Sequence, residues 1–189
     1  MASASPRRRE LLAQIGVRFD CQSADIDESV HDAERPAEYV SRLALEKARA
    51  VASVAADVWV LGSDTSVVCD QQILGKPGNK EEAVAMLRML SGRRHQVLTA
   101  VALVQGERQR SLLVSTDVVF RELSRSECEH YWETGEPRDK AGSYAIQGLG
   151  AVFVERIEGS YSAVVGLPLQ ETAQLLQQLG VPIWQRGGV

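Results

Sequence analysis

Helical segments alternate along this 189-residue chain with single strands and with pairs of strands, and this alternation limits the possible folds most strongly. Residues 35–54 carry the clearest helical pattern, because their apolar residues recur on one stripe, at Val40, Leu43, Ala44 and Val51. Residues 59–69 are apolar except for Gly62-Ser63-Asp64-Thr65, which predicts two strand segments around a polar bend.

The rest of the chain continues this alternation. A capping pattern at 79–82 predicts a helix that ends at 91–92, and a second at 124–127 predicts a helix that ends at Gly135. The other expected elements are strands 96–104 and 112–123, a glycine-rich loop 136–150, a hairpin of strands 152–157 and 160–165, and a helix 168–179. This order predicts an α/β fold with a mixed central sheet and flanking helices rather than a purely parallel sheet.

Length and composition narrow the class of protein. A chain of 189 residues with 44% hydrophobic residues suits one domain, 1–189, with its own core. The net charge of −4 argues against general nucleic-acid binding. We find neither a signal peptide nor an apolar run long enough to cross a membrane, and three separated cysteines suit free thiols, so we expect a cytoplasmic protein.

Arginines occupy an unusual place near the N-terminus. Ser5 suits an N-cap, Pro6 suits the first helical position, and Gly16 ends the helix. Cations are unfavourable in a first turn, yet residues 7–9 are all arginine. Backbone N–H groups, the hydroxyl groups of Ser3 and Ser5 and the guanidinium groups could together bind a phosphate chain. The alternative is a solvated basic patch.

Two further charged residues depart from the expected pattern. Lys47 lies on the apolar stripe of helix 35–54, so it either extends to the edge of the stripe or reaches an anion in a cleft. Asp64 follows an apolar strand, where α/β proteins often bind ligands, although Asp-Thr is also ordinary turn chemistry.

Other charged groups are candidates for ligand binding. Lys76 follows a short apolar hairpin, and Lys140 lies in the glycine-rich loop. The acidic group of Asp25, Asp27 and Glu28 could hold a hard divalent cation or could be a solvated loop. His31, His95 and His130 share no motif spacing, and we assign them no role.

Six motifs in order closely resemble the Maf family of nucleoside triphosphate pyrophosphatases along nearly the whole chain. They are the Ala2–Arg8 opening, the RLAxxKA helix at 42–48, the Gly-Ser-Asp-Thr turn at 62–65, the Lys-Pro segment at 75–77, the LSGxxH stretch at 90–95 and the DKAGxYxIQG loop at 139–148. The resemblance implies a mixed α/β fold with two lobes around a cleft, distantly like inosine triphosphatases, and a homodimer.

The resemblance also implies a reaction, in which the α–β phosphoanhydride of a nucleoside triphosphate is hydrolysed to monophosphate and pyrophosphate with a divalent cation, Mg²⁺, Mn²⁺ or Co²⁺. Asp64 would be the general base, a metal ligand, or both in succession, with Glu28 as its partner in holding the metal. Lys140 would lie near the leaving group. The residues that would neutralise the triphosphate are Ser3, Arg8, Lys47 and Lys76.

Three positions separate subgroups of the family by base. Here they are Arg7, Thr65 and Gln147, a combination that resembles the dTTP/UTP group, which could extend to modified uridine triphosphates. A Gln amide can both donate to and accept from the uracil or thymine edge. The alternatives are the same chemistry on 7-methyl-GTP, or a non-catalytic nucleotide-binding regulator of cell division.

The family usually has an apolar strand ahead of the opening motif, whereas here Met1 alone precedes Ala2. We therefore expect one of two explanations. Either the start assigned to the protein is too late, or the loop around Ser3 is looser than in other members of the family.

Overall fold

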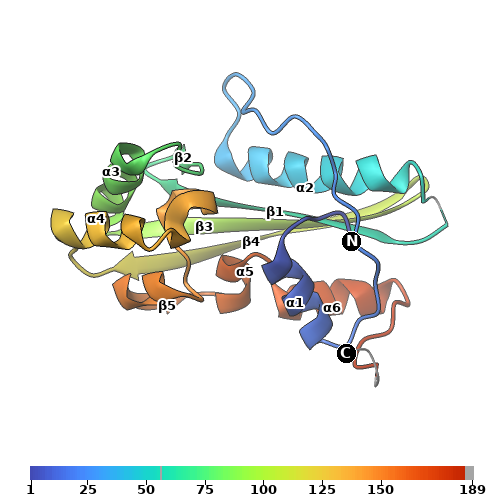
Figure 1. The fold of residues 1–189 in the computed structure, drawn as a ribbon. Coiled ribbons are helices and arrows are strands. Elements are labelled where there is room, and N and C mark those ends of the chain that lie inside the picture. Colours follow the sequence, from blue (N-terminus) through green and yellow to red (C-terminus); the bar gives the residue numbers. More distant parts are fainter. Residues whose placement is uncertain (56, 186–189) are drawn as a thin grey trace. The chain divides into compact units, whose positions relative to one another are not determined.

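The computed structural model describes residues 1–55 and 57–185, which divide into two compact units. Unit 1 contains Met1–Asp64, Thr99–Val114 and the described residues of Gly166–Val189, and unit 2 contains Thr65–Leu98 and Ser115–Val165. The helices are α1 (Pro6–Gln14), α2 (Pro36–Ala52), α3 (Lys80–Leu90), α4 (Arg125–Glu133), α5 (Tyr161–Val165) and α6 (Leu169–Gln178) (Figure 1). The strands are β1 (Val60–Cys69), β2 (Gln72–Leu74), β3 (Arg94–Gln105), β4 (Arg108–Phe120) and β5 (Val154–Glu158).

The five strands form one sheet in the order β2-β1-β3-β4-β5. β1 and β2 pair antiparallel with Val67 opposite Leu74, and β4 and β5 pair antiparallel with Val118 opposite Ile157. Only two residues separate β3 from β4, which is a hairpin connection and requires antiparallel strands. Isolated parallel bridges also join Ala2 to Gly62 and to Gln22. The prediction of a mixed α/β structure with flanking helices is therefore confirmed.

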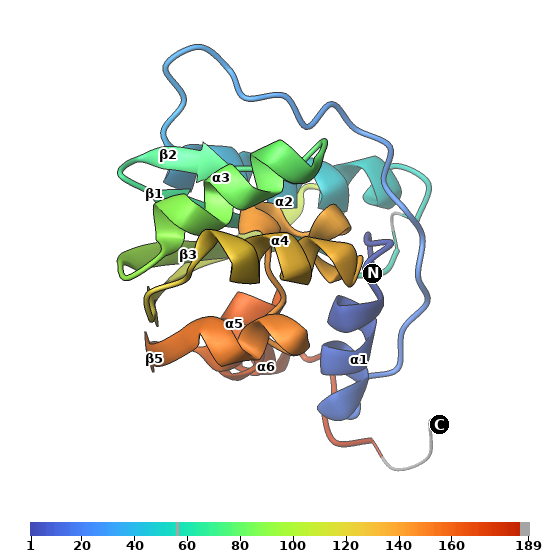
Figure 2. The ribbon, with the colours of Figure 1, turned by 60° about the vertical axis from the view of Figure 1, so that its left-hand side comes forward.

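In unit 1, helices cover both faces of the strands. α2 lies on one face and α6 on the other, as Figures 1 and 2 both show. The stripe on α2 that was predicted to be apolar is buried, from Val40 to Val51. The Ala2 backbone N–H donates to the Leu61 carbonyl at 2.7 Å, so the segment ahead of α1 is anchored on β1.

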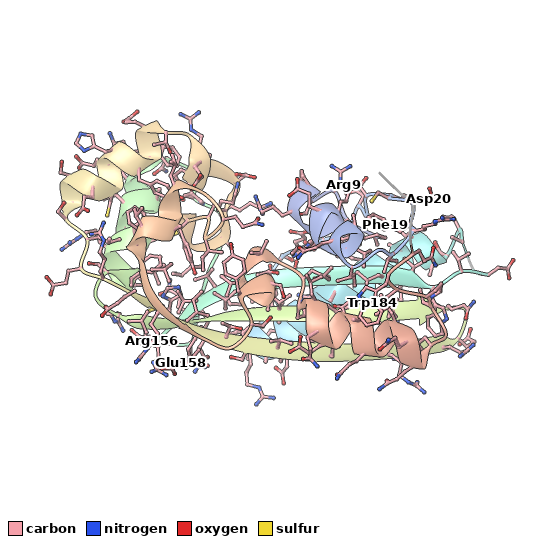
Figure 3. All side chains as sticks on the ribbon, turned by 90° about the horizontal axis from the view of Figure 1, so that it is seen from below. Arg9, Phe19, Asp20, Arg156, Glu158 and Trp184 are labelled. Atoms are coloured by element: carbon pink, nitrogen blue, oxygen red, sulfur yellow. The ribbon has the colours of Figure 1, made fainter. Side chains whose placement is uncertain are left out.

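Unit 2 has its own core. α3 and α4 pack against each other, and Phe120 makes ring contacts with His95, Tyr144 and Phe153. The edge strand β5 carries charge: Arg156 and Glu158 lie together on it, with Nη2 3.1 Å from Oε1 (Figure 3). Charged side chains on an edge strand disfavour pairing with another chain.

The predicted helix starts are confirmed by their caps. The side chains of Ser5, Asn79 and Ser124 accept hydrogen bonds from backbone N–H groups three residues later, at 3.5, 2.9 and 3.2 Å. Gly16 and Gly135 follow helices α1 and α4 with positive φ values of 68° and 79°, as expected for glycine after a helix.

Two predicted elements are wrong. Residues 59–69 do not form two strands around a bend, because β1 runs unbroken through Gly62-Ser63-Asp64-Thr65. Residues 160–165 do not form the second strand of a hairpin, because Tyr161–Val165 is the helix α5. Ser160 caps that helix by accepting a hydrogen bond from Ala163 N–H at 3.2 Å, and β5 pairs with β4 instead. A short apolar run alone does not distinguish a strand from a buried helix.

All three cysteines are free thiols, as predicted. In the described part of the chain, we find no helix with the length and apolar character needed to cross a membrane.

Candidate active site

A buried lysine joins two carboxylates in unit 1. Lys47 Nζ lies 2.7 Å from Asp64 Oδ1 and 2.7 Å from Glu28 Oε1. The side chains of Lys47 and Asp64 are only 11% and 10% exposed, whereas that of Glu28 is 51% exposed. Lys47 therefore does not extend from the apolar stripe to solvent but pairs with two carboxylates of the protein, and its contact with a bound anion stays a prediction.

Asp64 lies in the middle of β1 rather than at the end of a strand. The polar residues there stay in the strand because other elements satisfy them: Asp64 binds Lys47 of α2, and the Ser63 hydroxyl donates to the Gly166 carbonyl at 3.1 Å. Gly62 lets α2 approach β1, since a Cβ placed on it would lie 2.2 Å from the Ala44 carbonyl oxygen. This close approach brings Lys47 within reach of Asp64.

The environment of Asp64 favours a proton acceptor. Burial raises the pKa of the Asp64 carboxyl group, and the nearby charges of Lys47 and Arg8 oppose this effect without cancelling it. A general base works best when its pKa lies closer to the working pH than that of an exposed aspartate. Asp64 is thus a carboxylate that can take a proton from a water molecule beside a cationic group.

The loop ahead of α1 and the first turn of that helix form the predicted phosphate-binding segment. Ser3 Oγ accepts a hydrogen bond from Ser5 N–H at 3.1 Å, and Arg8 Nε donates to the Gly166 carbonyl at 2.9 Å. Burial lowers the pKa of the Arg8 guanidinium, while the charges of Asp64 and Glu28 act to raise it. The Arg8 guanidinium is therefore close enough to both carboxylates to interact with them electrostatically.

The other two arginines of this turn differ in exposure. Arg7 is half-buried, whereas Arg9 is exposed on α1 (Figure 3). Arg7 and Arg8 are thus less exposed than Arg9.

Hydrogen bonds to α2 hold the loop that carries Glu28. The Tyr39 hydroxyl donates to the Glu28 carbonyl at 2.9 Å, and Arg42 Nη2 donates to the Ser29 carbonyl at 2.9 Å. Arg42 also binds Glu34 at 2.6 Å, and this contact lowers the pKa of Glu34 to about 2. The same helix therefore supplies Lys47 and fixes the backbone of the loop that presents Glu28.

The acidic residues in this loop do not act as one group. Asp27 Oδ1 accepts a hydrogen bond from Ser29 N–H at 2.8 Å, and this contact lowers the pKa of Asp27. Within residues 1–55 and 57–185, no three side chains of His, Cys, Asp or Glu gather as a metal site.

Glu28 and Asp64 nevertheless direct their oxygens at one cation, the Lys47 ammonium. Mg²⁺ is commonly bound by one or two carboxylates together with substrate phosphates and water molecules. Two carboxylates together with substrate phosphates would meet this requirement, and in this structure the Lys47 ammonium lies between them.

Unit 2 carries the other predicted substrate residues. Thr65 follows Asp64 on β1 and is half-buried, while Lys76 and Gln147 are exposed. Lys140 forms an ion pair with its neighbour Asp139. The Gly142 N–H donates to the Gly75 carbonyl at 3.1 Å, so the loop with Lys140 is tied to the segment with Lys76.

Two residues of structural importance had no assigned role in the sequence. Gly166 presents one carbonyl to both Arg8 and Ser63, and its only sequence signal is a glycine between α5 and the Leu-Pro pair that precedes α6. His95 is buried, with Nε2 2.9 Å from the Tyr144 hydroxyl, and burial lowers its pKa to about 4. His95 ends the LSGxxH stretch at 90–95, but that motif gave no indication of this contact.

Comparison with known proteins gives a consistent result. The family described as "Maf-like protein" matches residues 1–179. The chain is 56% identical over 185 residues to a protein of Pseudoalteromonas atlantica named dTTP/UTP pyrophosphatase, covering 96% of each chain. It is 58% identical over 179 residues to a protein of the same name from Vibrio parahaemolyticus, covering 94% of this chain and 95% of the relative. A third protein of that name, from Saccharophagus degradans, is 56% identical over 189 residues, covering 98% of this chain and 90% of the relative.

Proposed function

Because the chain belongs to the Maf family, we propose that it is a nucleoside triphosphate pyrophosphatase that hydrolyses dTTP and UTP to the nucleoside monophosphate and pyrophosphate. The observation that carries this proposal is the buried contact of Lys47 with Asp64 and Glu28, close to Arg8. Burying these charges is costly, and a protein that only needed a stable fold could place apolar residues there. The names of the relatives support dTTP and UTP as substrates.

The reaction needs a water molecule to attack the α-phosphorus while the bond to the bridging α–β oxygen breaks. Asp64 accepts the proton of that water molecule, since its pKa is raised and its carboxylate is held by Lys47. Ser3, Arg8, Lys47 and Lys76 bind and neutralise the phosphate oxygens, and Lys140 stabilises the charge on the departing pyrophosphate. A divalent cation held by Glu28 and Asp64 would draw further negative charge from these oxygens when bound.

Base recognition in this proposal belongs to Arg7, Thr65 and Gln147. The Gln147 side chain is exposed and therefore available to a ligand. Its amide can donate to O4 and accept from N3–H of uracil or thymine. Modified uridine triphosphates with the same edge are possible substrates for the same reason.

The decisive experiment is product analysis of the purified protein with dTTP, UTP, 7-methyl-GTP and GTP, each with Mg²⁺, Mn²⁺ or Co²⁺. The proposal expects monophosphate and pyrophosphate in equal amounts, with the two pyrimidine nucleotides preferred. Orthophosphate and a diphosphate would place the attack at another phosphorus atom. Tight nucleotide binding without turnover under any of these conditions would favour a regulator instead.

The divalent cation, the homodimer and the cytoplasmic location are parts of the same proposal. Loss of turnover after chelation, with recovery on adding one of the three metals, would support the cation. Sedimentation velocity gives the oligomeric state, and fractionation of cells that produce the protein gives its location. The three free thiols suit a reducing compartment.

A further inference from the structure

The carboxylate of Glu136, a residue with no role in the proposed reaction, lies against the turn that follows Gln147. Glu136 Oε2 accepts a hydrogen bond from the Leu149 N–H at 2.9 Å, and Glu136 Oε1 accepts one from the Gly150 N–H at 2.9 Å. The Tyr131 hydroxyl donates to the same Oε1 at 2.6 Å. The side chain at the start of the glycine-rich loop 136–150 thus binds backbone that closely follows the proposed base-reading residue.

The same pair of side chains also holds the backbone ahead of Gln147. The Tyr131 hydroxyl accepts a hydrogen bond from the Ala145 N–H at 3.1 Å. Tyr131 and Glu136 therefore contact the loop two residues before Gln147 and two and three residues after it. Gln147 itself is exposed, and the backbone held in this way sets the position from which its side chain extends.

The turn is shaped around the carboxylate. A Cβ placed on Gly148 would lie 2.0 Å from Glu136 Oε2, and one placed on Gly150 would lie 2.7 Å from the Tyr131 hydroxyl. Only residues without a side chain allow the carboxylate and the hydroxyl to lie this close to the backbone. The close contacts of Tyr131 and Glu136 with this backbone therefore depend on the glycines at positions 148 and 150.

The protonation states of Glu136 and Tyr131 are those that these hydrogen bonds require. Burial acts to raise the pKa of Glu136, but the hydrogen bonds from Tyr131, Gly150 and Leu149 outweigh it, so the pKa is lowered and the group is a carboxylate at neutral pH. Burial and the bond to Glu136 raise the pKa of Tyr131, so its hydroxyl group remains a donor. Hydrogen bonds to an ionised acceptor are stronger than those between neutral groups.

We propose that Glu136, supported by Tyr131, is a positioning residue that sets the direction of the Gln147 amide and thereby the base specificity of the reaction. This inference rests on the proposed function, because it needs Gln147 to read the base. Glu136 touches neither the phosphate chain nor the reacting atoms in this scheme. The effect we expect from it is on which base is accepted.

The test uses Glu136→Gln in the full-length protein. The carboxylate accepts hydrogen bonds from two backbone N–H groups. The amide that replaces it has one N–H₂ donor, which would face one of these donors, so the turn must shift. We expect the ratio of kcat/KM for UTP to that for GTP to fall about 10-fold, the size expected for loss of a charged hydrogen bond. Tyr131→Phe keeps the ring but removes both the donor to Glu136 and the acceptor for the Ala145 N–H. It leaves the two backbone bonds to the Glu136 carboxylate in place, so it should lower the ratio less. Glu155→Gln, an exposed glutamate on β5, is the matched control and should leave the ratio unchanged.

A double-mutant cycle tests whether Glu136 acts through Gln147. Once Gln147→Ala has removed the amide, adding Glu136→Gln should cause little further loss of base preference. The same ratio measured as Kd values of UTP and GTP by titration calorimetry makes the test independent of turnover. Thermal melts identify variants that do not fold, and Tyr131→Phe then carries the test.

The outcomes are distinct. A base ratio unchanged in Glu136→Gln and Tyr131→Phe, while Gln147→Ala alters it, overturns the inference and leaves the proposed function standing. Additive losses in the double variant would also overturn it, because Glu136 would then act independently of Gln147. Wild-type protein that binds UTP selectively without hydrolysing it would contradict the proposed function, and the Kd ratios would still decide the role of Glu136.

Discussion

Lys47 on α2 and Asp64 on β1 are buried together, with Nζ and Oδ1 2.7 Å apart. Neither charge would be stable there alone, since an unpaired buried charge is strongly disfavoured. Gly62, two residues before Asp64, lets α2 approach close enough for the contact. Packing of the helix on the strand and assembly of the candidate active site are therefore the same structural feature.

Asp64→Asn should still fold and bind nucleotide, with a lower melting temperature because Lys47 loses one of its two carboxylate partners, but should lose most of its turnover. The amide has nearly the same shape as the carboxylate but cannot take a proton from water, and a positioned general base contributes roughly 10²–10⁴-fold to the rate. Pyrophosphate release and a thermal melt are the two measurements. A variant with half the wild-type rate and an unchanged melting temperature would remove Asp64 from the chemistry.

Lys47→Met should both destabilise the protein and weaken triphosphate binding. A methionine suits the apolar stripe of α2, so the sequence alone suggests that the fold would tolerate it. The ion pairs reverse this expectation, because Asp64 would keep its buried charge without the ammonium. Removing one partner of a buried pair costs about 3 kcal/mol or more.

The matched control for this prediction is Lys80→Met. Lys80 pairs with Glu133 at the surface, where such pairs contribute about 0–1 kcal/mol. Urea unfolding of both variants gives the comparison. Equal free energies of unfolding for Lys47→Met and the wild type would mean that the contact with Asp64 contributes nothing to stability.

The parts of the fold that were predicted correctly depend on local interactions. Ser5, Asn79 and Ser124 cap helices through contacts that span three residues, so the sequence pattern contains the whole interaction. The unbroken course of β1 depends on partners far along the chain. Ser63 is satisfied by Gly166 and Asp64 by Lys47, and a local pattern of polar residues cannot reveal such partners.

The residues of the candidate site likewise differ in whether the sequence alone could identify them. Lys47 was recognised because a lysine on an apolar stripe is anomalous by itself, and the structure supplies its partners. Glu136 was not recognised, because a glutamate beside a loop has no unusual feature until the backbone of residues 149 and 150 folds back onto it. The catalytic, metal-binding and substrate-binding roles assigned to the site residues, Thr65, Lys76 and Lys140 included, remain predictions.

Gly62→Ala should destabilise the protein and reduce its activity. The added methyl group would meet backbone atoms of α2, at 2.2 Å from the Ala44 carbonyl oxygen and 2.7 Å from the Ala48 nitrogen, so the helix must move. Overpacking of this kind costs about 1–3 kcal/mol. Gly75→Ala is the control, because no described atom lies within 4 Å of the added Cβ. A Gly62→Ala protein as stable as Gly75→Ala would contradict the close packing of α2 on β1.

His95 should make the protein less stable as the pH falls from about 6.5 to about 4. Burial lowers the pKa of His95 from 6.5 to about 4, so in this window the unfolded chain takes up a proton that the folded protein does not. The free energy of unfolding should fall by about 1.4 kcal/mol per pH unit from this group, or about 3 kcal/mol over the window.

Urea unfolding at pH 7 and pH 5 measures this effect, with His95→Gln as the comparison. The amide cannot titrate but can still bond to the Tyr144 hydroxyl group. If the stability of both proteins falls equally between the two pH values, His95 does not cause the acid sensitivity.

Gln147→Glu should change the base preference of the enzyme. If the Gln147 amide donates to the pyrimidine O4, the substitution replaces that donor with an acceptor, which then faces another acceptor. An opposed or unpaired polar group in a partly desolvated site costs about 1–3 kcal/mol. This cost corresponds to a fall in kcat/KM for dTTP and UTP of roughly 5- to 150-fold. Guanine nucleotides offer N–H donors to the new carboxylate and should lose less, or gain. The ratio of the two kcat/KM values is therefore the informative measurement, and equal losses for all bases would mean that Gln147 supports its loop without reading the base.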